Sequence, residues 1–473
     1  MIFASTTFIF LFLPMTIGIY YGLLRKHRSL QNIFLAFASL FFYAWGEPKF
    51  VVCMLVSILV NWFLGFNVGL LKEKRKYGHA KKIVAIDIVF NLSMLFIFKY
   101  LSFIGSTLEE SLKINLSIPE IALPIGISFF TFQAMSYVID VYRGNGEYQK
   151  SIMNVALYIS CFPQLIAGPI VRYETVAYEI DHRKENWDEF LDGFSRFIIG
   201  LSKKVLIANT LSIYADSAFE SISQLSVADS WMGAICYAFQ IYYDFSGYSD
   251  MAIGLGKMFG FHYLENFNYP YISKTITEFW RRWHISLGTW FRDYVYIPLG
   301  GSHVKKTRLY FNLFIVWLST GIWHGANWTF MIWGLMYFSL LVFEKKTGIP
   351  NKEYGKVLGG LQWIGTMFFV LIGWVVFRAN SIMQALSYIK VMLCMSGQDL
   401  IDWGFINTLN KVWMFLLLAI MFSAPSIPNY IQKIKRKSVS LEITYQIILV
   451  LMFVVTLVSI VSSEHNPFIY FNF

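Results

Sequence analysis

The chain has 473 residues, of which 56% are hydrophobic and only 14% are charged. Soluble globular domains carry about 25% charged residues, so this composition excludes an ordinary soluble protein and indicates that lipid surrounds much of the chain. The net charge of +10 comes from short basic clusters between apolar stretches, which is typical of cytoplasmic loops, and we therefore expect no nucleic acid partner.

Apolar stretches long enough to cross a bilayer, about 20 residues each, follow one another along the sequence. The first begins almost at Met1, and its basic cluster, Arg25 to Arg28, comes after the apolar run. A cleavable signal peptide has the opposite order, so we expect a first transmembrane helix. The predicted membrane segments are 6–24, 29–45, 49–71, 83–104, 119–141, 152–171, 190–214, 229–259, 309–322, 326–344, 359–378, 410–425 and 442–462.

The loop charges predict one orientation. The basic run Lys72 to Lys82 follows the third segment, two helices after the first basic cluster, so both clusters fall on the same side. Glu109 and Glu110 lie in the next loop, on the opposite side. Basic loops are cytoplasmic, which places the N-terminus outside. No linker divides the sequence, and we expect a single domain over 1–473 with a motif-rich core at about 120–380.

Two segments depart from simple membrane helices. The run 152–171 contains Pro163 and Pro169, which predicts a broken or re-entrant helix. The block 271–301 mixes aromatic, basic and glycine residues, and it is too polar for a helix that faces lipid. It fits an amphipathic or re-entrant segment at the cytoplasmic interface.

Two histidines are the strongest candidates for chemistry. His324 lies deep in an apolar stretch, within GIWHGANW, and His284 lies in RRWHISLG. Ionisable residues inside a membrane are costly and suggest function, and a neutral imidazole is a common general base. The alternative for each is a polar residue that joins helices by hydrogen bonds, and His284 could also orient His324 or the substrate.

The neighbours of His324 favour a site over a purely structural role. Gly321 and Gly325 leave room for close approach of a substrate or of another backbone. Asn327 and Trp328 follow at i+3 and i+4, so they share the face of His324 if the segment is helical.

A second polar island, DFSGYSDMAIG, contains Asp244 and Asp250 within an apolar stretch. Each acid could pair with an arginine, bind a cation or hydrogen-bond to a neighbouring helix. The sequence has no G-x-S-x-G serine elbow and no HExxH or phosphate-binding loop. We therefore expect no metal ion.

Several motifs together resemble the membrane-bound O-acyltransferase family, and in particular its bacterial branch that O-acetylates cell-surface polysaccharides such as alginate. The resemblance covers nearly the whole chain. It rests on residues 38–50, 123–144, 162–173, 239–254, 278–301 and 321–328 and on the ending 467–473.

The resemblance implies an all-α polytopic membrane fold of about 11–13 transmembrane or re-entrant helices around a central funnel or tunnel. It implies an acyltransferase (EC 2.3.1.-) with His324 as catalytic residue and His284 as the second histidine. Acyl transfer needs a base for the hydroxyl group and a donor to the oxyanion. Asn327, Trp323, Trp328, Asp250 and Asp244 are then supporting or tunnel-lining residues.

The same resemblance implies the reactants. The donor is a cytoplasmic thioester, for this branch acetyl-CoA, with no bound cofactor. Arg281 and Arg282 could attract its phosphates or serve as interfacial anchors. The acetyl group leaves on the outer side of a bacterial inner membrane, by way of an extracytoplasmic hydrolase-like acetyltransferase, and reaches a polysaccharide such as alginate or peptidoglycan.

Three alternatives stay open. The intramembrane Asp and His residues could form the path of a transporter or channel. The chain could transfer D-alanyl groups to teichoic acid, as related membrane proteins do with a carrier-protein donor. It could also be a non-catalytic scaffold for a secreted acetyltransferase.

Overall fold

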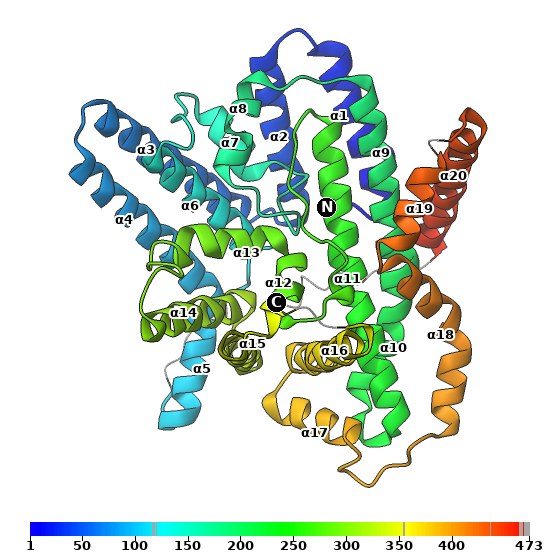
Figure 1. The fold of residues 1–473 in the computed structure, drawn as a ribbon. Helices are drawn as coiled ribbons and strands as arrows, with labels where there is room; N and C mark the ends of the chain where they lie inside the picture. The colour runs from blue at the N-terminus through cyan, green and yellow to red at the C-terminus, as the bar shows by residue number, and fades with distance from the viewer. Residues whose placement is uncertain (116–118, 120, 353–354, 436, 463–466, 468–473) are drawn as a thin grey trace. The chain divides into compact units, whose positions relative to one another are not determined.

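A computed structural model describes residues 1–115, 119, 121–352, 355–435, 437–462 and 467. Over these residues the protein is built from helices and loops and contains no strand (Figure 1). The predicted all-α class is therefore confirmed. The ending 467–473, which contributes to the resemblance, lies outside the described residues apart from Pro467.

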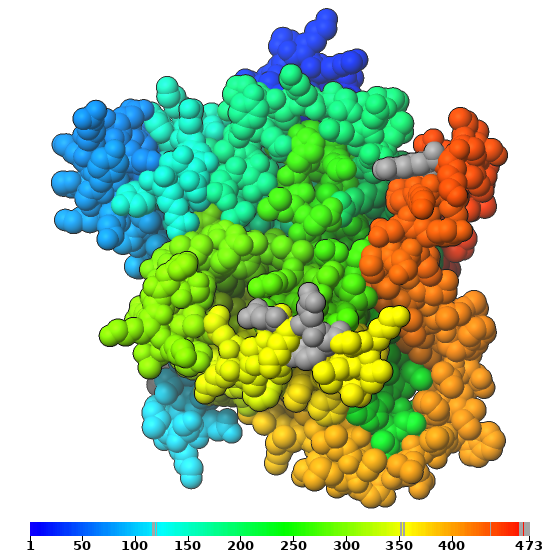
Figure 2. Space-filling view, in the orientation of Figure 1, coloured from blue at the N-terminus to red at the C-terminus, as the bar shows by residue number. Residues whose placement is uncertain are grey.

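Six helical stretches of the described chain are long and apolar enough to cross a membrane, and this confirms a multi-pass membrane protein. Many of their apolar side chains are exposed, as expected for lipid-facing positions. The C-terminal helices, orange to red in Figure 2, are a clear example, with Leu451 60% and Val458 61% exposed. The six stretches are Val51–Glu73, Tyr77–Leu112, Trp187–Glu220, Lys356–Arg378, Trp403–Phe422 and Val439–Ser462.

The chain forms two compact units, whose boundaries run through helices α9 (Trp187–Ser202) and α11 (Val227–Met258). Unit 1 comprises 1–197 and 249–264, and unit 2 comprises 198–248 and 265–473. The expectation of a single domain over 1–473 stays a prediction.

Unit 1 contains the N-terminal helices, several of which include a wider π-helical turn. Its first segment, for example, is interrupted twice by such turns between Phe8 and Leu23. The elements besides α9 and α11 are η1 (Phe8–Phe12), α1 (Leu13–Gly18), η2 (Ile19–Leu23), α2 (Arg28–Gly46), α3 (Val51–Glu73), α4 (Tyr77–Leu95), η3 (Phe96–Tyr100), α5 (Leu101–Leu112), α6 (Ile127–Arg143), α7 (Ile152–Ser160) and α8 (Tyr173–His182).

Helix α6 is shorter at its start than the predicted segment 119–141. It begins at Ile127 because Gly126, with φ of +74°, is left-handed and cannot continue a helix. Gly144, with φ of +85°, ends it in the same way. A hydropathy pattern does not register these backbone breaks.

The predicted break in 152–171 is present. Helix α7 ends at Ser160, and the following residues to Val171 are non-helical and buried. Non-helical backbone at membrane depth requires partners within the protein. Here the Phe162 N–H donates to Ser39 Oγ at 3.0 Å, and the Tyr158 hydroxyl donates to the Val171 carbonyl at 2.8 Å.

Unit 2 contains the histidine motifs. Helix α14 and helix α15 form an antiparallel pair, and the block 271–301 folds into short helices joined by tight turns. Besides the parts of α9 and α11, the elements are η4 (Lys203–Ala208), α10 (Asn209–Glu220), η5 (Ile222–Gln224), η6 (Pro270–Ile272), α12 (Ile276–Arg282), α13 (Ile285–Phe291), η7 (Arg292–Tyr296), α14 (Lys306–His324), α15 (Trp328–Thr347), η8 (Ile349–Asn351), α16 (Lys356–Arg378), α17 (Ile382–Met392), α18 (Trp403–Phe422), α19 (Ser426–Lys435) and α20 (Val439–Ser462).

Candidate active site

His324 is the last residue of α14, which ends there because the next residue, Gly325, is extended. The imidazole is nearly buried, with 7% exposed. Three ring centroids lie 5.1 Å from the imidazole centroid, those of Trp323, Trp333 and Phe377. The carboxyl end of a helix favours positive charge, and aromatic faces attract cations. The His324 imidazole is thus enclosed by three aromatic rings at the carboxyl end of a helix.

Close packing of α14 on α15 fixes the position of His324. A Cβ atom on Gly321 would lie 2.5 Å from the Phe330 carbonyl oxygen, and one on Gly325 would overlap the Phe330 ring. On the other helix, a Cβ atom on Gly334 would lie 2.5 Å from the Trp317 carbonyl oxygen. The sequence left open whether Gly321 and Gly325 admit a substrate or another part of the chain, and the structure shows that α15 fills this space.

His284 lies between α12 and α13 in a left-handed conformation, with φ of 46° and ψ of 53°. A non-glycine residue in this region costs of order 1–3 kcal/mol and persists only where its surroundings impose it. Here the segment that precedes η6 imposes the left-handed conformation on His284. The Ile285 N–H donates to the Asn266 carbonyl at 2.9 Å, and the Asn268 N–H donates to the Arg282 carbonyl at 2.9 Å.

The Asn266 side chain determines which ring nitrogen of His284 carries the proton. The backbone N–H and the hydroxyl of Ser286 donate to Asn266 Oδ1 at 3.1 and 2.8 Å, which identifies that atom as the amide oxygen. His284 Nδ1 lies 3.2 Å from the same oxygen. An amide oxygen only accepts, so Nδ1 is the donor and Nε2 presents a lone pair. Burial lowers the pKa of His284 to about 3, which keeps the ring neutral.

The two histidines share one aromatic wall. The centroid of the Trp323 ring lies 5.1 Å from that of His324 and 6.1 Å from that of His284. Two residues that are 40 positions apart in sequence are thus brought to the same indole, and this supports treating them as one site.

A carboxylate from α15 holds the start of α12. Glu344 is buried and accepts from the N–H groups of Ile276 and Thr277 at 2.6 and 2.8 Å. A negative charge at the start of a helix is favourable. Helix α12 leads into His284, and α15 packs against α14, which ends at His324. Glu344 therefore joins the two helices that hold the two histidines in place.

Asn327 and Trp328 do not lie on the helix of His324, so the condition for a shared helical face is not met. Asn327 caps α15: its Oδ1 accepts from the Thr329 N–H at 3.1 Å, and its Nδ2 donates to the Asn380 carbonyl at 3.0 Å. Trp328 is 49% exposed. The physical reason is the chain break at Gly325, which i+3 and i+4 spacing cannot reveal.

Arg281 and Arg282 differ in their surroundings. Arg281 is exposed. Arg282 donates from Nε to Glu278 Oε1 at 2.9 Å and from Nη1 to the Asn268 carbonyl at 3.1 Å, so it stabilises the turn before His284. A donor-binding role for either arginine stays a prediction.

Both acids of the polar island form ion pairs. In unit 2, Asp244 Oδ1 accepts from Lys204 Nζ at 2.9 Å, and both side chains are buried. In unit 1, Asp250 Oδ1 accepts from Arg196 Nη2 at 2.7 Å. Of the roles that the sequence left open, the structure therefore assigns helix pairing to these acids.

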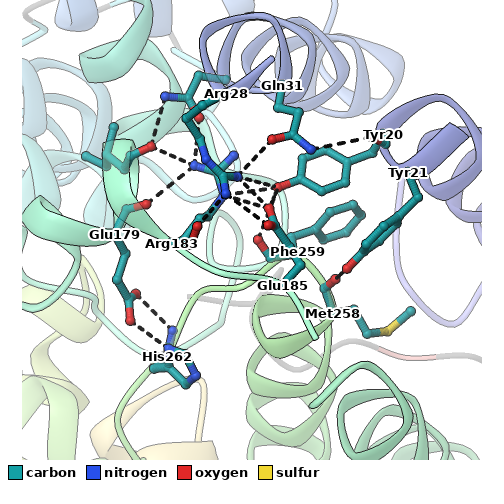
Figure 3. A network of polar contacts seen from close by, with 12 residues as sticks. Tyr20, Tyr21, Arg28, Gln31, Glu179, Arg183, Glu185, Met258, Phe259 and His262 are labelled. Carbon is teal, nitrogen blue, oxygen red and sulfur yellow. Dashed lines mark hydrogen bonds and ion pairs between the residues drawn. The ribbon is translucent and has the colours of Figure 1, made fainter. Parts of the chain in front are cut away.

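Unit 1 has a dense charged network of its own (Figure 3). Arg28 Nη2 donates to Glu185 Oε2 at 2.9 Å, and Arg183 Nε donates to the Tyr20 hydroxyl at 3.1 Å. Arg183 Nη1 also donates to Asn32 Oδ1 at 2.7 Å. These bonds join η2, α2 and the turn between α8 and α9.

Sequence reasoning missed several residues around the site. Asn266 and Glu344 carried no motif of their own, although an acid near the end of the apolar stretch 309–347 was a visible signal. Trp333 and Phe377 read as ordinary apolar positions. Two ionisable residues in the span Tyr77–Leu112, Asp87 and Lys99, were also overlooked.

Residues 147–386 match the family model described as MBOAT, membrane-bound O-acyltransferase family. The chain belongs to this family. It is therefore an acyltransferase as well as a multi-pass membrane protein, and its family region contains both histidines. Among curated relatives it is similar to a probable alginate O-acetylase of Pseudomonas aeruginosa, with 42% identity over 81% of this chain and 73% of that protein.

Two further relatives extend the similarity. A probable alginate O-acetylase of Pseudomonas putida is 36% identical over the full length of both proteins. A peptidoglycan O-acetyltransferase of Helicobacter pylori is 34% identical over 90% of this chain and 86% of that protein. Relatives named for different acceptors, alginate and peptidoglycan, are thus similar to this chain.

Proposed function

We propose that this membrane-bound O-acyltransferase moves an acetyl group from a cytoplasmic thioester, acetyl-CoA, toward a polysaccharide on the outer side of a bacterial inner membrane. The observation that carries the proposal is the pair of buried histidines on one indole. The names of the relatives, alginate O-acetylase and peptidoglycan O-acetyltransferase, support an acetyl group and a polysaccharide acceptor.

In the proposed reaction His324 is the general base. It takes the proton of the acceptor hydroxyl as the oxygen attacks the thioester carbonyl, and the C–S bond breaks as the tetrahedral intermediate collapses. The proton then passes from the imidazolium to the thiolate, so the products are an ester and a thiol. A base of this kind contributes about 10²- to 10⁴-fold in rate.

His284 is proposed to position the acceptor by accepting a hydrogen bond from a hydroxyl group next to the one that attacks, because the proton of the attacking hydroxyl goes to His324. Its Nε2 presents a lone pair, because Asn266 holds the proton on Nδ1. A neutral ring in this tautomer accepts a hydrogen bond at Nε2, which suits a hydroxyl better than an oxyanion. Asn327, whose amide caps α15, is likewise poorly disposed to serve as the oxyanion donor.

The remaining reactants complete the proposal. Arg281, which is exposed, is the better candidate of the two arginines for attracting the phosphates of acetyl-CoA. The acetyl group passes to an extracytoplasmic hydrolase-like acetyltransferase that delivers it to the polysaccharide. The N-terminus lies outside, as the positive-inside pattern indicates.

The test is transfer of labelled acetyl groups from acetyl-CoA in membranes that contain the full chain. We expect label to appear in polysaccharide or in a partner protein with wild type and not with His324→Ala. Labelling from a D-alanyl carrier protein, with none from acetyl-CoA, would replace acetyl transfer by the teichoic acid alternative. Uptake of a solute without transfer would favour a transporter.

A further inference from the structure

Helices α3, α4 and α6 of unit 1 pack against one another (Figure 1), and α3 and α4 are polar on their inner faces and apolar outside, whereas α6 is buried from Ile127 to Val141. Their inner positions include side chains that are 0% exposed although they are polar, such as Asn61, Asp87 and Asn91. Outward positions are apolar, with Leu59 52% and Val89 64% exposed. Polar residues that face the interior of a membrane bundle suggest function.

These inner residues form what we call the polar seam. It runs along α4 and η3 from Asp87 to Lys99, which at 1.5 Å per helical residue is about 18 Å, more than half of a hydrocarbon core of about 30 Å. At its far end Lys99 Nζ donates to Ser128 Oγ of α6 at 3.3 Å. The seam comprises Ser57, Asn61, Asp87, Asn91, Lys99, Ser128 and Gln133.

Asp87 has one side-chain partner, and it is neutral. Asn91 Nδ2 donates to Asp87 Oδ1 at 3.1 Å, and the same nitrogen lies 3.0 Å from Asn61 Oδ1. Asp87 Oδ2 is buried and has no partner in the described chain. No basic side chain of the described residues lies within 4.0 Å of this carboxylate, in contrast to Asp244 and Asp250.

Other titratable groups on the packed helices are engaged elsewhere. On α6, the Tyr137 hydroxyl accepts from the Gln149 N–H at 3.1 Å, and Asp140 Oδ2 accepts from the Glu174 N–H at 3.0 Å. On α3, Lys72 Nζ donates to the Val141 carbonyl at 2.6 Å. An ionised Asp87 would therefore be an unpaired charge in the membrane interior, which costs several kcal/mol. A proton removes that cost.

Further buried polar atoms along the three helices lack a partner in the described chain. They are both amide atoms of Gln133, Thr131 Oγ1 and Trp62 Nε1. Gln133 lies one turn from Tyr137, whose ring packs on α3 at Gly65, so it faces the α3 side of α6. Buried polar atoms in native proteins are bonded to protein or to water. Water bonded to the Gln133 amide would lie on the face of α6 that packs on α3.

We propose that Asp87 is a proton-binding site in the membrane interior and that the polar seam is the hydrated route by which its proton exchanges. The carboxylate takes a proton from a water chain in the seam, and the acid returns it to the chain. Nothing is oxidised or reduced. The site is independent of acyl transfer at His324.

Infrared spectra of the full-length protein in lipid nanodiscs test this. At neutral pH we expect a protonated-carboxyl C=O band that shifts in D2O and is lost in Asp87→Asn. Asp250→Asn is the matched control, because that carboxylate is paired with Arg196 and should contribute no such band. Asp87→Glu should keep a band at an altered frequency, which covers the case in which Asp87→Asn does not fold.

A band that is absent in wild type would overturn the proposal and indicate a bound cation or an ionised acid. A band that persists in Asp87→Asn would assign it to another residue. Gln133→Leu tests the route: the band should remain, and its shift in D2O should slow at least several-fold. An unchanged exchange rate in Gln133→Leu would remove the seam from the proposal, and a band that never shifts would show a sealed, structural acid.

Discussion

The histidine site of unit 2 and the arginine network of unit 1 use buried polar groups in opposite ways. Around Arg183, cations, carboxylates and a phenol are bonded to one another, and the bonds join elements far apart in sequence. Around His324, three aromatic rings have their centroids 5.1 Å from that of the imidazole. Mutual pairing fixes a fold, whereas His324, enclosed by aromatic rings, is the residue to which we assign proton transfer in the proposed function. The following predictions test this contrast.

The largest effect should come from His324→Ala. We expect acetylation to fall by about 10²- to 10⁴-fold, the usual contribution of a general base, with membrane insertion and thermal stability close to wild type. The measurement is acetate content of the polysaccharide in cells that express each variant. His79→Ala, which removes an exposed histidine of α4, is the control. Wild-type acetylation in His324→Ala would make the histidine structural.

Arg183→Ala should show the opposite pattern. Removal of one partner from a buried charged network leaves the others uncompensated, which costs about 3–5 kcal/mol. We expect a clear loss of thermal stability in detergent, measured by unfolding of the purified protein. Lys184→Ala, at the adjacent position, should have little effect. A variant as stable as wild type but inactive would mean that the network takes part in chemistry.

Asn266→Ala should have an intermediate effect, because it releases the tautomer and orientation of His284. We expect kcat to fall by about tenfold, equivalent to about 1.4 kcal/mol in the barrier, with KM for acetyl-CoA little changed. Asn266→Asp keeps the accepting oxygen and adds a charge that favours imidazolium. It should restore part of kcat and displace the pH–rate profile. Equal losses in both variants with an unchanged profile would indicate a packing role.

The smallest effect concerns His262. Partial burial acts to lower its pKa, but hydrogen bonds and charges of Glu179 and Glu189 outweigh this and raise the pKa above 6.5. Its contribution to stability is therefore present below the ordinary pKa of about 6.5 and is lost as pH rises through the raised value. His262→Gln should flatten the dependence of unfolding temperature on pH between about 6 and 8. An unchanged slope would exclude this triad as its source.

Much of this could be predicted from the sequence. Apolar segments gave the membrane class, prolines located the break after α7, and motifs identified His324, His284 and the family. The rest depended on backbone geometry. The left-handed Gly126 shortened α6, and the extended Gly325 removed Asn327 and Trp328 from the helix of His324. Asp87 was overlooked because one acid in a long apolar run barely alters its mean hydropathy.

The sequence by itself determined that this chain is a membrane protein and which histidines are candidates for its chemistry, because hydropathy and local motifs are properties of neighbouring residues. Only the tertiary structure decided which polar groups are paired. Asp244 and Asp250 are paired with basic side chains, Asn266 is bonded to His284, and Asp87 is bonded to an amide. Each of these pairs forms because the fold brings particular parts of the chain together. A buried carboxylate that is paired with a basic side chain supports the structure, whereas one without such a pair can bind a proton.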